Sequence, residues 1–194
     1  MRKISFFLVL MVGCLTINQF DDVIKKQGII ETEVGWGSIV YLNNHYLVTA
    51  SHLYEEDKMA RVYFEGKLDP NLKFIYKKND ITLLKTNIDF TDKPTIISTV
   101  SVNDDVYWVQ TIPTTSGFEK LWFQGNVATV NDSVVIVDRP FYSGASGSGV
   151  YDISGNLVAI VSRYQTYENG LSFGIAEIPR FPLFIQQLID GGEH

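Results

Sequence analysis

The hydrophobic and polar positions of this chain form short apolar or alternating runs separated by turn residues. Runs rich in Val, Ile, Tyr and Phe are typical of β-strands, in which successive side chains face opposite sides of a sheet. Asn, Asp, Gly and Pro separate these runs, so the pattern predicts an all-β barrel or sandwich. The runs lie at 37–42, 45–49, 60–64, 72–76, 95–100, 106–109, 121–123, 127–130, 134–137 and 157–161.

The pattern changes at two places after the first strands. The polar segment 89–94 ends in a proline and interrupts the strand signals, so we expect it to connect two halves, 31–93 and 94–180. Beyond residue 180 the period becomes helical. Pro182 can start a helix, Gly191 and Gly192 can end it, and apolar residues recur at spacings of three and four. The sequence therefore predicts a C-terminal helix and tail over 181–194, with an apolar face of Phe184, Ile185, Leu188 and Ile189.

The N-terminus carries a pattern of its own. Arg2 and Lys3 precede an apolar stretch that is too short to span a bilayer in the usual way, which is typical of a secretory signal at 1–14. Cys14 is the only cysteine, and the preceding Met-Val-Gly resembles a bacterial lipobox. Two alternatives stay open: lipidation of Cys14, which would tether the protein to a membrane, or a cleaved signal with an incidental cysteine. We expect an exported protein, extracellular, periplasmic or lipid-anchored, with a polar leader at 15–30.

Composition narrows the classes of function. The chain has 194 residues, 16 basic and 22 acidic, with a net charge of −6, which disfavours a nucleic-acid partner. It lacks H-E-x-x-H, paired cysteines and the P-loop motif, so no metal ion and no organic cofactor is expected. The part that remains after the leader is long enough for one compact unit without disulfides.

Three short segments offer nucleophilic chemistry. Ser146 lies among glycines in Gly-Ala-Ser-Gly, His52 follows a strand-like run, and Asp80 directly precedes the apolar run 81–84. A serine hydroxyl needs an imidazole to take its proton, and the imidazole needs a carboxylate to fix its tautomer. The order His, Asp, Ser is one of three known orders for this arrangement.

Each segment also has a simpler interpretation. A Gly/Ser-rich stretch is most often a plain loop, and an aspartate after Lys-Lys-Asn is often a turn residue. His45 and His194 are interpreted as ordinary core or surface residues. Asp105, which opens the run 106–109, is the alternative carboxylate.

Taken together, residues 47–52, 80–85 and 144–147 resemble the motifs of the chymotrypsin-type (trypsin-like) serine endopeptidases. With Ser148 in this place, the motif resembles that of bacterial branches of the family such as the glutamyl endopeptidases and the high-temperature-requirement proteases. The resemblance implies two six-stranded antiparallel β-barrels with the active site between them and a C-terminal α-helix. His52 and Asp80 would come from the first barrel and Ser146 from the second. It also implies an acyl-enzyme mechanism on a protein or peptide substrate, with the N–H groups of Gly144 and Ser146 as oxyanion hole.

Two departures from the family matter. Ala145 replaces the aspartate that pairs with a newly cut N-terminus in zymogen-type members, so the resemblance implies that this switch is not used. No acid lies where cleavage after Lys or Arg would require one, since Pro140 falls six residues before Ser146. By resemblance the substrate-binding residues are Ser162, near the aspartate, and Arg163, Tyr164, Phe141 and Phe173 around the first pocket.

The preference for the residue before the scissile bond, P1, depends on the direction of Arg163. Pointing inward, its charge would favour an acidic P1 residue; pointing outward, it leaves an apolar pocket. Rival interpretations of the whole chain are a catalytically silent binding module with a protease fold, and a β-rich lipoprotein whose motif matches are accidental.

Overall fold

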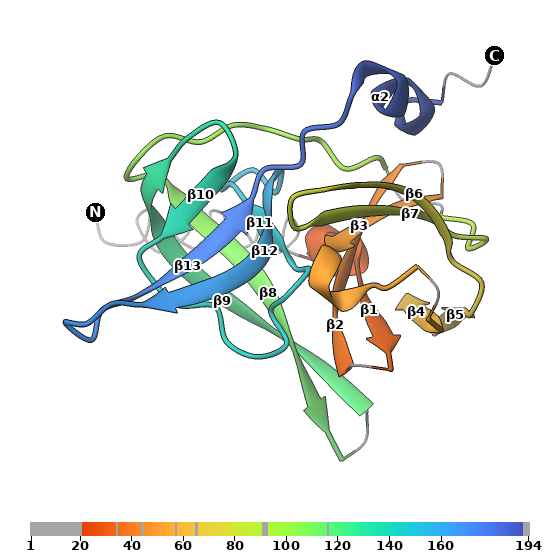
Figure 1. Ribbon diagram of the computed structural model, residues 1–194, viewed down its shortest axis with the longest axis horizontal. Helices are drawn as coiled ribbons and strands as arrows, with labels where there is room; N and C mark the ends of the chain where they lie inside the picture. Colours follow the sequence, from red (N-terminus) through yellow and green to blue (C-terminus); the bar gives the residue numbers. More distant parts are fainter. Residues whose placement is uncertain are drawn as a thin grey trace, which may run out of the picture.

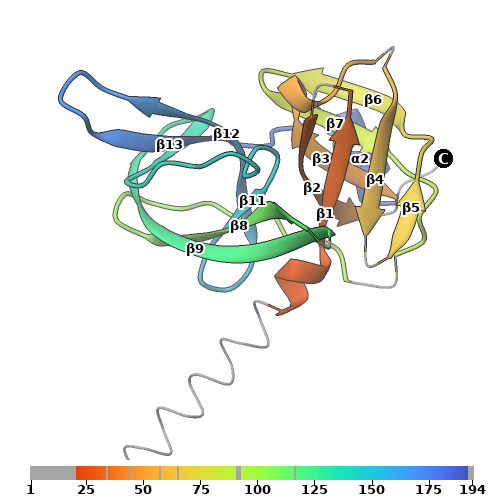
Figure 2. The same ribbon diagram turned by 90° about the horizontal axis from the view of Figure 1, so that it is seen from below.

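The computed structural model describes residues 21–33, 35–43, 45–56, 58–64, 66–90, 93–115 and 117–191. Two β-sheet units lie side by side, and a short C-terminal helix packs at one end of the molecule (Figure 1). A quarter turn shows the same two units separated along the long axis, with the first seven strands on one side and the last six on the other (Figure 2). The predicted all-β class with a C-terminal helix is confirmed.

The first unit is a seven-stranded antiparallel sheet with the order β5-β4-β1-β2-β3-β7-β6. We expected a closed six-stranded barrel here; instead, the edge strands β5 and β6 do not pair in the described structure. The end of β5 is instead tied to the segment that follows β7, because the Asp69 carboxylate accepts hydrogen bonds of 2.6 Å from Thr86 Oγ1 and Asn87 N. The strands are β1 (Gln27–Thr32), β2 (Gly35–Asn43), β3 (Tyr46–Ala50), β4 (Ala60–Phe64), β5 (Lys67–Asp69), β6 (Lys73–Lys78) and β7 (Ile81–Lys85).

The second unit is a closed six-stranded barrel with the order β10-β13-β12-β11-β8-β9, as predicted. The runs 121–123 and 127–130 belong to one long strand, which pairs with β8 along a hairpin. The run 95–100 is not a strand; it is a connection with one bridge, Ile97 to Leu157. The strands are β8 (Asp105–Thr114), β9 (Gly117–Val130), β10 (Val134–Val137), β11 (Gly149–Tyr151), β12 (Leu157–Thr166) and β13 (Ser172–Glu177).

The helix α2 (Leu183–Ile189) packs on a core that both units share. Ile185 and Ile189 are buried in this core and Leu188 packs against it, as the helical period predicts. Phe184 is 61% exposed, so the apolar face is narrower than predicted. No helix among the described residues is long and apolar enough to cross a membrane.

The first unit begins earlier than the predicted boundary at residue 31. Within the predicted leader, 21–25 is helical, Val23 is 2% exposed, and β1 pairs with both β2 and β4. The polar residues of this stretch hid the strand, because Gln27 is fully buried and makes hydrogen bonds that a sequence pattern does not show. The predicted signal at 1–14, with Cys14, lies outside the described residues.

Candidate active site

Adjacent strands bring His52 and Asp80 together. His52 lies on the single 3-10 turn Ser51–Leu53 that follows β3, and Asp80 lies in the tight turn between β6 and β7. Asn79 takes a left-handed backbone conformation with φ 54°, which lets this turn close. Because β3 pairs with β7, and Ser51 N donates a 3.0 Å hydrogen bond to the Asp80 carbonyl, the two side chains start from neighbouring positions.

The two side chains are joined by short hydrogen bonds. His52 Nδ1 lies 2.9 Å from Asp80 Oδ2 and 3.1 Å from Oδ1, and the His52 backbone N–H also donates to Oδ1 at 3.0 Å. From the other side, Ser162 Oγ donates to Oδ2 at 2.6 Å. An Nδ1–H held by the carboxylate leaves Nε2 as the free acceptor of the neutral ring.

Asp80 is held in its charged form. Burial acts to raise the pKa of this carboxyl, but the hydrogen bonds from His52 and Ser162 and the attraction to His52 outweigh burial, so the pKa lies below its usual value. The alternative carboxylate is elsewhere: Asp105 accepts hydrogen bonds from Gln124 and Asn126 on β9. The site therefore presents an ionised carboxylate behind the histidine.

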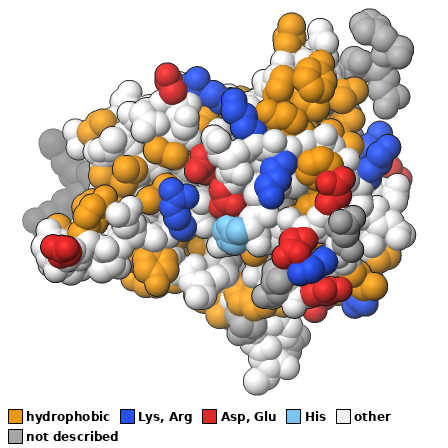
Figure 3. All heavy atoms as spheres, viewed as in Figure 1, with side chains coloured by type: hydrophobic (Ala, Val, Ile, Leu, Met, Phe, Trp, Pro, Cys, Tyr) orange, Lys and Arg blue, Asp and Glu red, His pale blue; other side chains and the backbone are white. Residues whose placement is uncertain are grey.

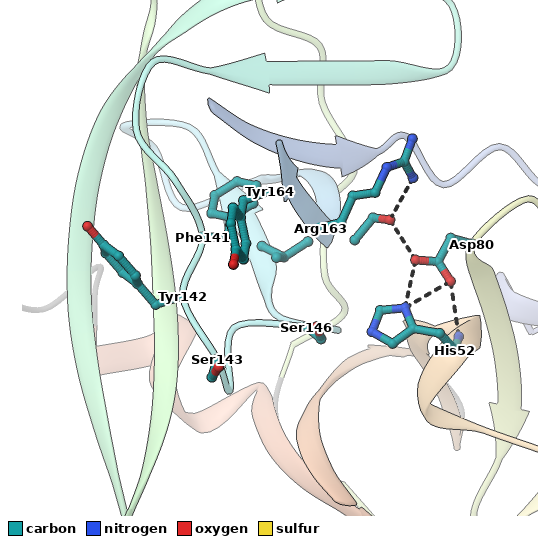
Figure 4. Close-up of a pocket in the computed structure, with 10 residues that line it drawn as sticks. His52, Asp80, Phe141, Tyr142, Ser143, Ser146, Arg163 and Tyr164 are labelled. Atoms are coloured by element: carbon teal, nitrogen blue, oxygen red, sulfur yellow. Dashed lines mark hydrogen bonds and ion pairs between the residues drawn. The ribbon is translucent and has the colours of Figure 1, made fainter. Parts of the chain in front are cut away.

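Ser146 lies on the loop between β10 and β11. Its carbonyl accepts a 2.8 Å hydrogen bond from Ser38 N, and the next residue, Gly147, donates to the Val161 carbonyl at 2.8 Å, so both units hold the loop. Gly147 has φ 78°, and a Cβ there would lie 2.0 Å from the Ser38 carbonyl, so only glycine fits. In the close-up, the His52 ring lies between Asp80 and Ser146 (Figure 4).

The chemistry of the loop can be read from its free groups. The N–H groups of Gly144 and Ser146 donate no hydrogen bond to any described residue. No hydrogen bond joins Ser146 Oγ to His52 in the described structure; in proteins without bound substrate this contact is often long. The nearby Ser148 is fully buried and donates to the Val109 carbonyl, which excludes it as a surface nucleophile.

A pocket of about 520 Å³ opens beside His52 and Ser146. The space-filling view shows a histidine side chain exposed at the surface between the two units, with acidic and basic side chains beside it (Figure 3). Of the five predicted substrate-binding residues, four line this pocket: Ser162, Arg163, Tyr164 and Phe141. Phe173 does not, and its ring packs on Tyr167 instead (centroids 5.7 Å). The lining is His52, Asp80, Phe141, Tyr142, Ser143, Ser146, Val161, Ser162, Arg163 and Tyr164.

The Arg163 side chain lines the pocket on the side of Asp80 and Ser162. Its Nη1 donates to Ser162 Oγ at 3.2 Å and lies 3.8 Å from Glu177 Oε1, so the guanidinium is turned toward the Asp80 side of the site (Figure 4). Glu177 is 7% exposed and was not predicted from the sequence. Among the described lining residues, Asp80 is the only acid, and it is already engaged. The remaining walls are largely aromatic and apolar.

A buried polar network lies behind the serine loop and ties the units together. Gln27 Nε2 donates to the Val109 carbonyl at 2.8 Å and lies 3.3 Å from the hydroxyls of Ser38 and Ser148. Ser38 Oγ and Thr111 Oγ1 are 3.0 Å apart. Sequence reasoning missed these residues because single polar residues within strand-like runs carry no local signal.

In the part of the chain that the structure describes, no cluster of His, Cys, Asp and Glu could hold a metal ion.

Comparisons with known proteins identify the family and the fold. Residues 35–160 match the trypsin-like peptidase domain family. The fold resembles the inactive form of Rv3671c from M. tuberculosis H37Rv in a serine-to-alanine mutant (TM-score 0.68, 13% identity, 91% of this chain and 92% of that one). It also resembles the serine endoprotease from Yersinia pestis (TM-score 0.68, 19% identity, 92% of this chain and 68% of that one). No curated protein sequence matches the chain.

Proposed function

The chain belongs to the trypsin-like peptidase family and is a serine-type endopeptidase, and we propose that it cleaves peptide bonds with His52, Asp80 and Ser146. The observation that carries this proposal is the pair of hydrogen bonds from His52 Nδ1 to the Asp80 carboxylate, beside the pocket that Ser146 also lines. This pair fixes the tautomer in which Nε2 can accept a proton from the serine.

The proposed reaction has two halves. Ser146 Oγ attacks the carbonyl carbon of the scissile bond as its proton passes to His52 Nε2, and the carbonyl oxygen becomes an oxyanion. The free N–H groups of Gly144 and Ser146 would stabilise this oxyanion, and each such donor contributes roughly 3 kcal/mol in well-studied cases. The tetrahedral intermediate collapses when His52 gives the proton to the leaving amine. Water then attacks the acyl-enzyme by the same steps and frees Ser146.

We propose an apolar P1 residue for the substrate. The pocket is framed by Phe141 and Tyr164, and the Arg163 guanidinium is occupied by Ser162 and Glu177. A Lys or Arg side chain would lose its hydration there without gaining a partner, which is costly. The basic and apolar residues at the start of the chain support action outside the cytoplasm, with Cys14 as a lipid attachment point.

The nucleophile is tested by labelling the purified protein with a fluorophosphonate probe and mapping the labelled peptide. We expect one label per chain, on Ser146, and none in Ser146→Ala. Ser154→Ala, an exposed serine in a turn outside the site, serves as the matched control. Equal labelling of Ser146→Ala would exclude Ser146 as nucleophile, and a folded wild-type protein that takes no label would favour the silent binding module.

A further inference from the structure

Gln110 is a buried glutamine of β8 that reaches the serine loop. It is 5% exposed, and its Nε2 donates a 2.7 Å hydrogen bond to the Ser143 carbonyl. Its Oε1 is also buried and has no hydrogen-bond partner among the described residues. Nearly all buried polar groups are paired, so a side chain with one unpaired end and one short bond stands out.

The bond to Ser143 sets the orientation of the next N–H group. The peptide between Ser143 and Gly144 is planar and trans, so its carbonyl and its N–H point in opposite directions. With the carbonyl held toward Gln110, the Gly144 N–H faces the other way, and it donates to no described residue. Ala145 N donates to the Tyr142 carbonyl at 3.0 Å, and Gly144 has φ 89°, as in a type II turn.

The turn alone does not fix this peptide. Glycine reaches both signs of φ with little cost, so the peptide before Gly144 can rotate and present its carbonyl where its N–H should be. Ala145 is fully buried and uncharged, so it offers no ion pair to hold the loop. The Gln110 amide is the side chain that the structure places on the Ser143 carbonyl.

We propose that Gln110 is a positioning residue that holds the Gly144 N–H in the oxyanion hole. Ala145 has no charge and cannot hold this loop through an ion pair. The inference rests on the proposed function, because it assigns a role within the same site. Gln110 touches no substrate atom in this scheme. It acts through the Ser143–Gly144 peptide, and its contribution appears when negative charge develops on the carbonyl oxygen. Loss of such an interaction lowers kcat more than it changes KM.

The first test is Gln110→Met, with Gln124→Met as the matched control on the exposed side of β9. Methionine has a similar length and removes the unpaired buried Oε1 together with the donor, so we expect the variant to fold. We expect kcat to fall by about tenfold to hundredfold relative to the wild type, a smaller decrease than removal of one oxyanion donor causes, and KM to stay within about threefold of the wild-type value. A kcat within about twofold of the wild type, in a protein with unchanged thermal unfolding, would overturn the proposal.

The second test separates positioning from packing. In Gln110→Glu the carboxyl can donate to Ser143 only when protonated, so the ratio of its kcat to that of the wild type should rise as the pH falls. The ratio removes pH effects that the two proteins have in common. A ratio that does not change with pH would contradict the assignment.

A binding measurement completes the design. A peptide aldehyde forms a tetrahedral adduct that fills the oxyanion hole, whereas the matching peptide alcohol cannot. Gln110→Met should lose aldehyde affinity in parallel with kcat and keep alcohol affinity; equal losses for both would indicate a packing defect and overturn the proposal. The wild-type rate and labelling report on the proposed function, and the variant-to-wild-type ratios report on Gln110.

Discussion

Ser162 Oγ donates a 2.6 Å hydrogen bond to Asp80 Oδ2 and so joins β12 of the closed barrel to the β6–β7 turn of the open sheet. The carboxylate is thereby held from two sides, by Ser162 from one unit and by His52 from its own. The orientation of the His52 ring therefore depends on how the two units are placed relative to each other.

The first prediction concerns this carboxylate. Asp80→Asn keeps the shape of the side chain but stabilises the wrong histidine tautomer, so we expect kcat to fall by about 10⁴ with little change in stability. Asp105→Asn, which alters a surface carboxylate on β8, is the control and should keep its activity. Steady-state kinetics on one peptide substrate compare the two. Should Asp105→Asn prove the more damaging change, the carboxylate has been misassigned.

The second prediction concerns Glu177. Burial raises the pKa of its carboxyl; Arg163 lowers it, the charge of Asp80 raises it and a hydrogen bond from Asn79 lowers it, and the net pKa lies above the usual value. The folded state therefore binds the proton of the Glu177 carboxyl more tightly than the unfolded state does. Its contribution to stability is fully present below the unfolded pKa and is lost as pH rises through the raised folded pKa.

Glu177→Gln should therefore have a higher melting temperature than the wild type at neutral pH, and the difference should shrink toward about pH 4. Thermal unfolding followed by circular dichroism across this range is the measurement. Glu119→Gln, at an exposed position of β9, controls for the loss of one negative charge. A lower melting temperature at neutral pH would mean that the ion pair with Arg163 outweighs burial.

The third prediction concerns the residue before the cleaved bond. A pocket lined by Phe141 and Tyr164, without a free acid among its described lining residues, should take a medium-sized apolar side chain. A peptide-library profile of the mature enzyme should show apolar P1 residues first, acidic ones second and Lys or Arg last. Dominant cleavage after Lys or Arg would require an acid in the pocket that the described residues do not provide.

The fourth prediction concerns Gln27. Its replacement by alanine leaves the buried Val109 carbonyl without this donor and opens a small cavity, so we expect a loss of about 2–4 kcal/mol in the free energy of unfolding. Chemical denaturation measures the loss, and Gln124→Ala provides an exposed comparison that should change stability little. Similar midpoints for both variants would show that the network is dispensable.

The fifth prediction concerns export. If the lipobox interpretation is right, protein from its native host begins at Cys14, carries acyl chains there and partitions into the membrane fraction. Intact-mass measurement decides between this outcome and a cleaved signal with an unmodified cysteine. A chain that still begins at Met1 would remove the basis for export.

The catalytic candidates could be predicted because their signals are local. His52 directly follows one strand-like run, Asp80 directly precedes another, and Ser146 lies in a short Gly-rich motif; the strand order then brings all three to one pocket. Phe173 could not be placed in this way. Successive side chains of a strand face opposite sides of the sheet. A shift of one residue in this alternation therefore decides whether position 173 or position 174 faces the pocket. Gly174 lies against Phe141, and Phe173 faces away.

Residues whose roles depend on distant partners gave no signal at all. Gln27, Gln110 and Glu177 are buried polar residues within strands, where a sequence pattern predicts apolar ones. The polar partners of these three side chains come from other elements: the Val109 and Ser143 carbonyls and the Arg163 guanidinium. The open edge of the first sheet was likewise invisible, since whether β5 meets β6 depends on the curvature of the whole unit.

The network around Gln27 also bears on when the protein can fold. Its partners Val109, Ser148 and Gly149 follow it by 82, 121 and 122 positions, so this part of the network cannot form until most of the chain has emerged. Contacts of such long range are slow to form, because a large loop must close before they stabilise anything. The serine loop depends on the same late contacts. A partly synthesised or partly translocated chain therefore has no assembled active site, and proteolytic activity can begin only when the last strands have joined the first.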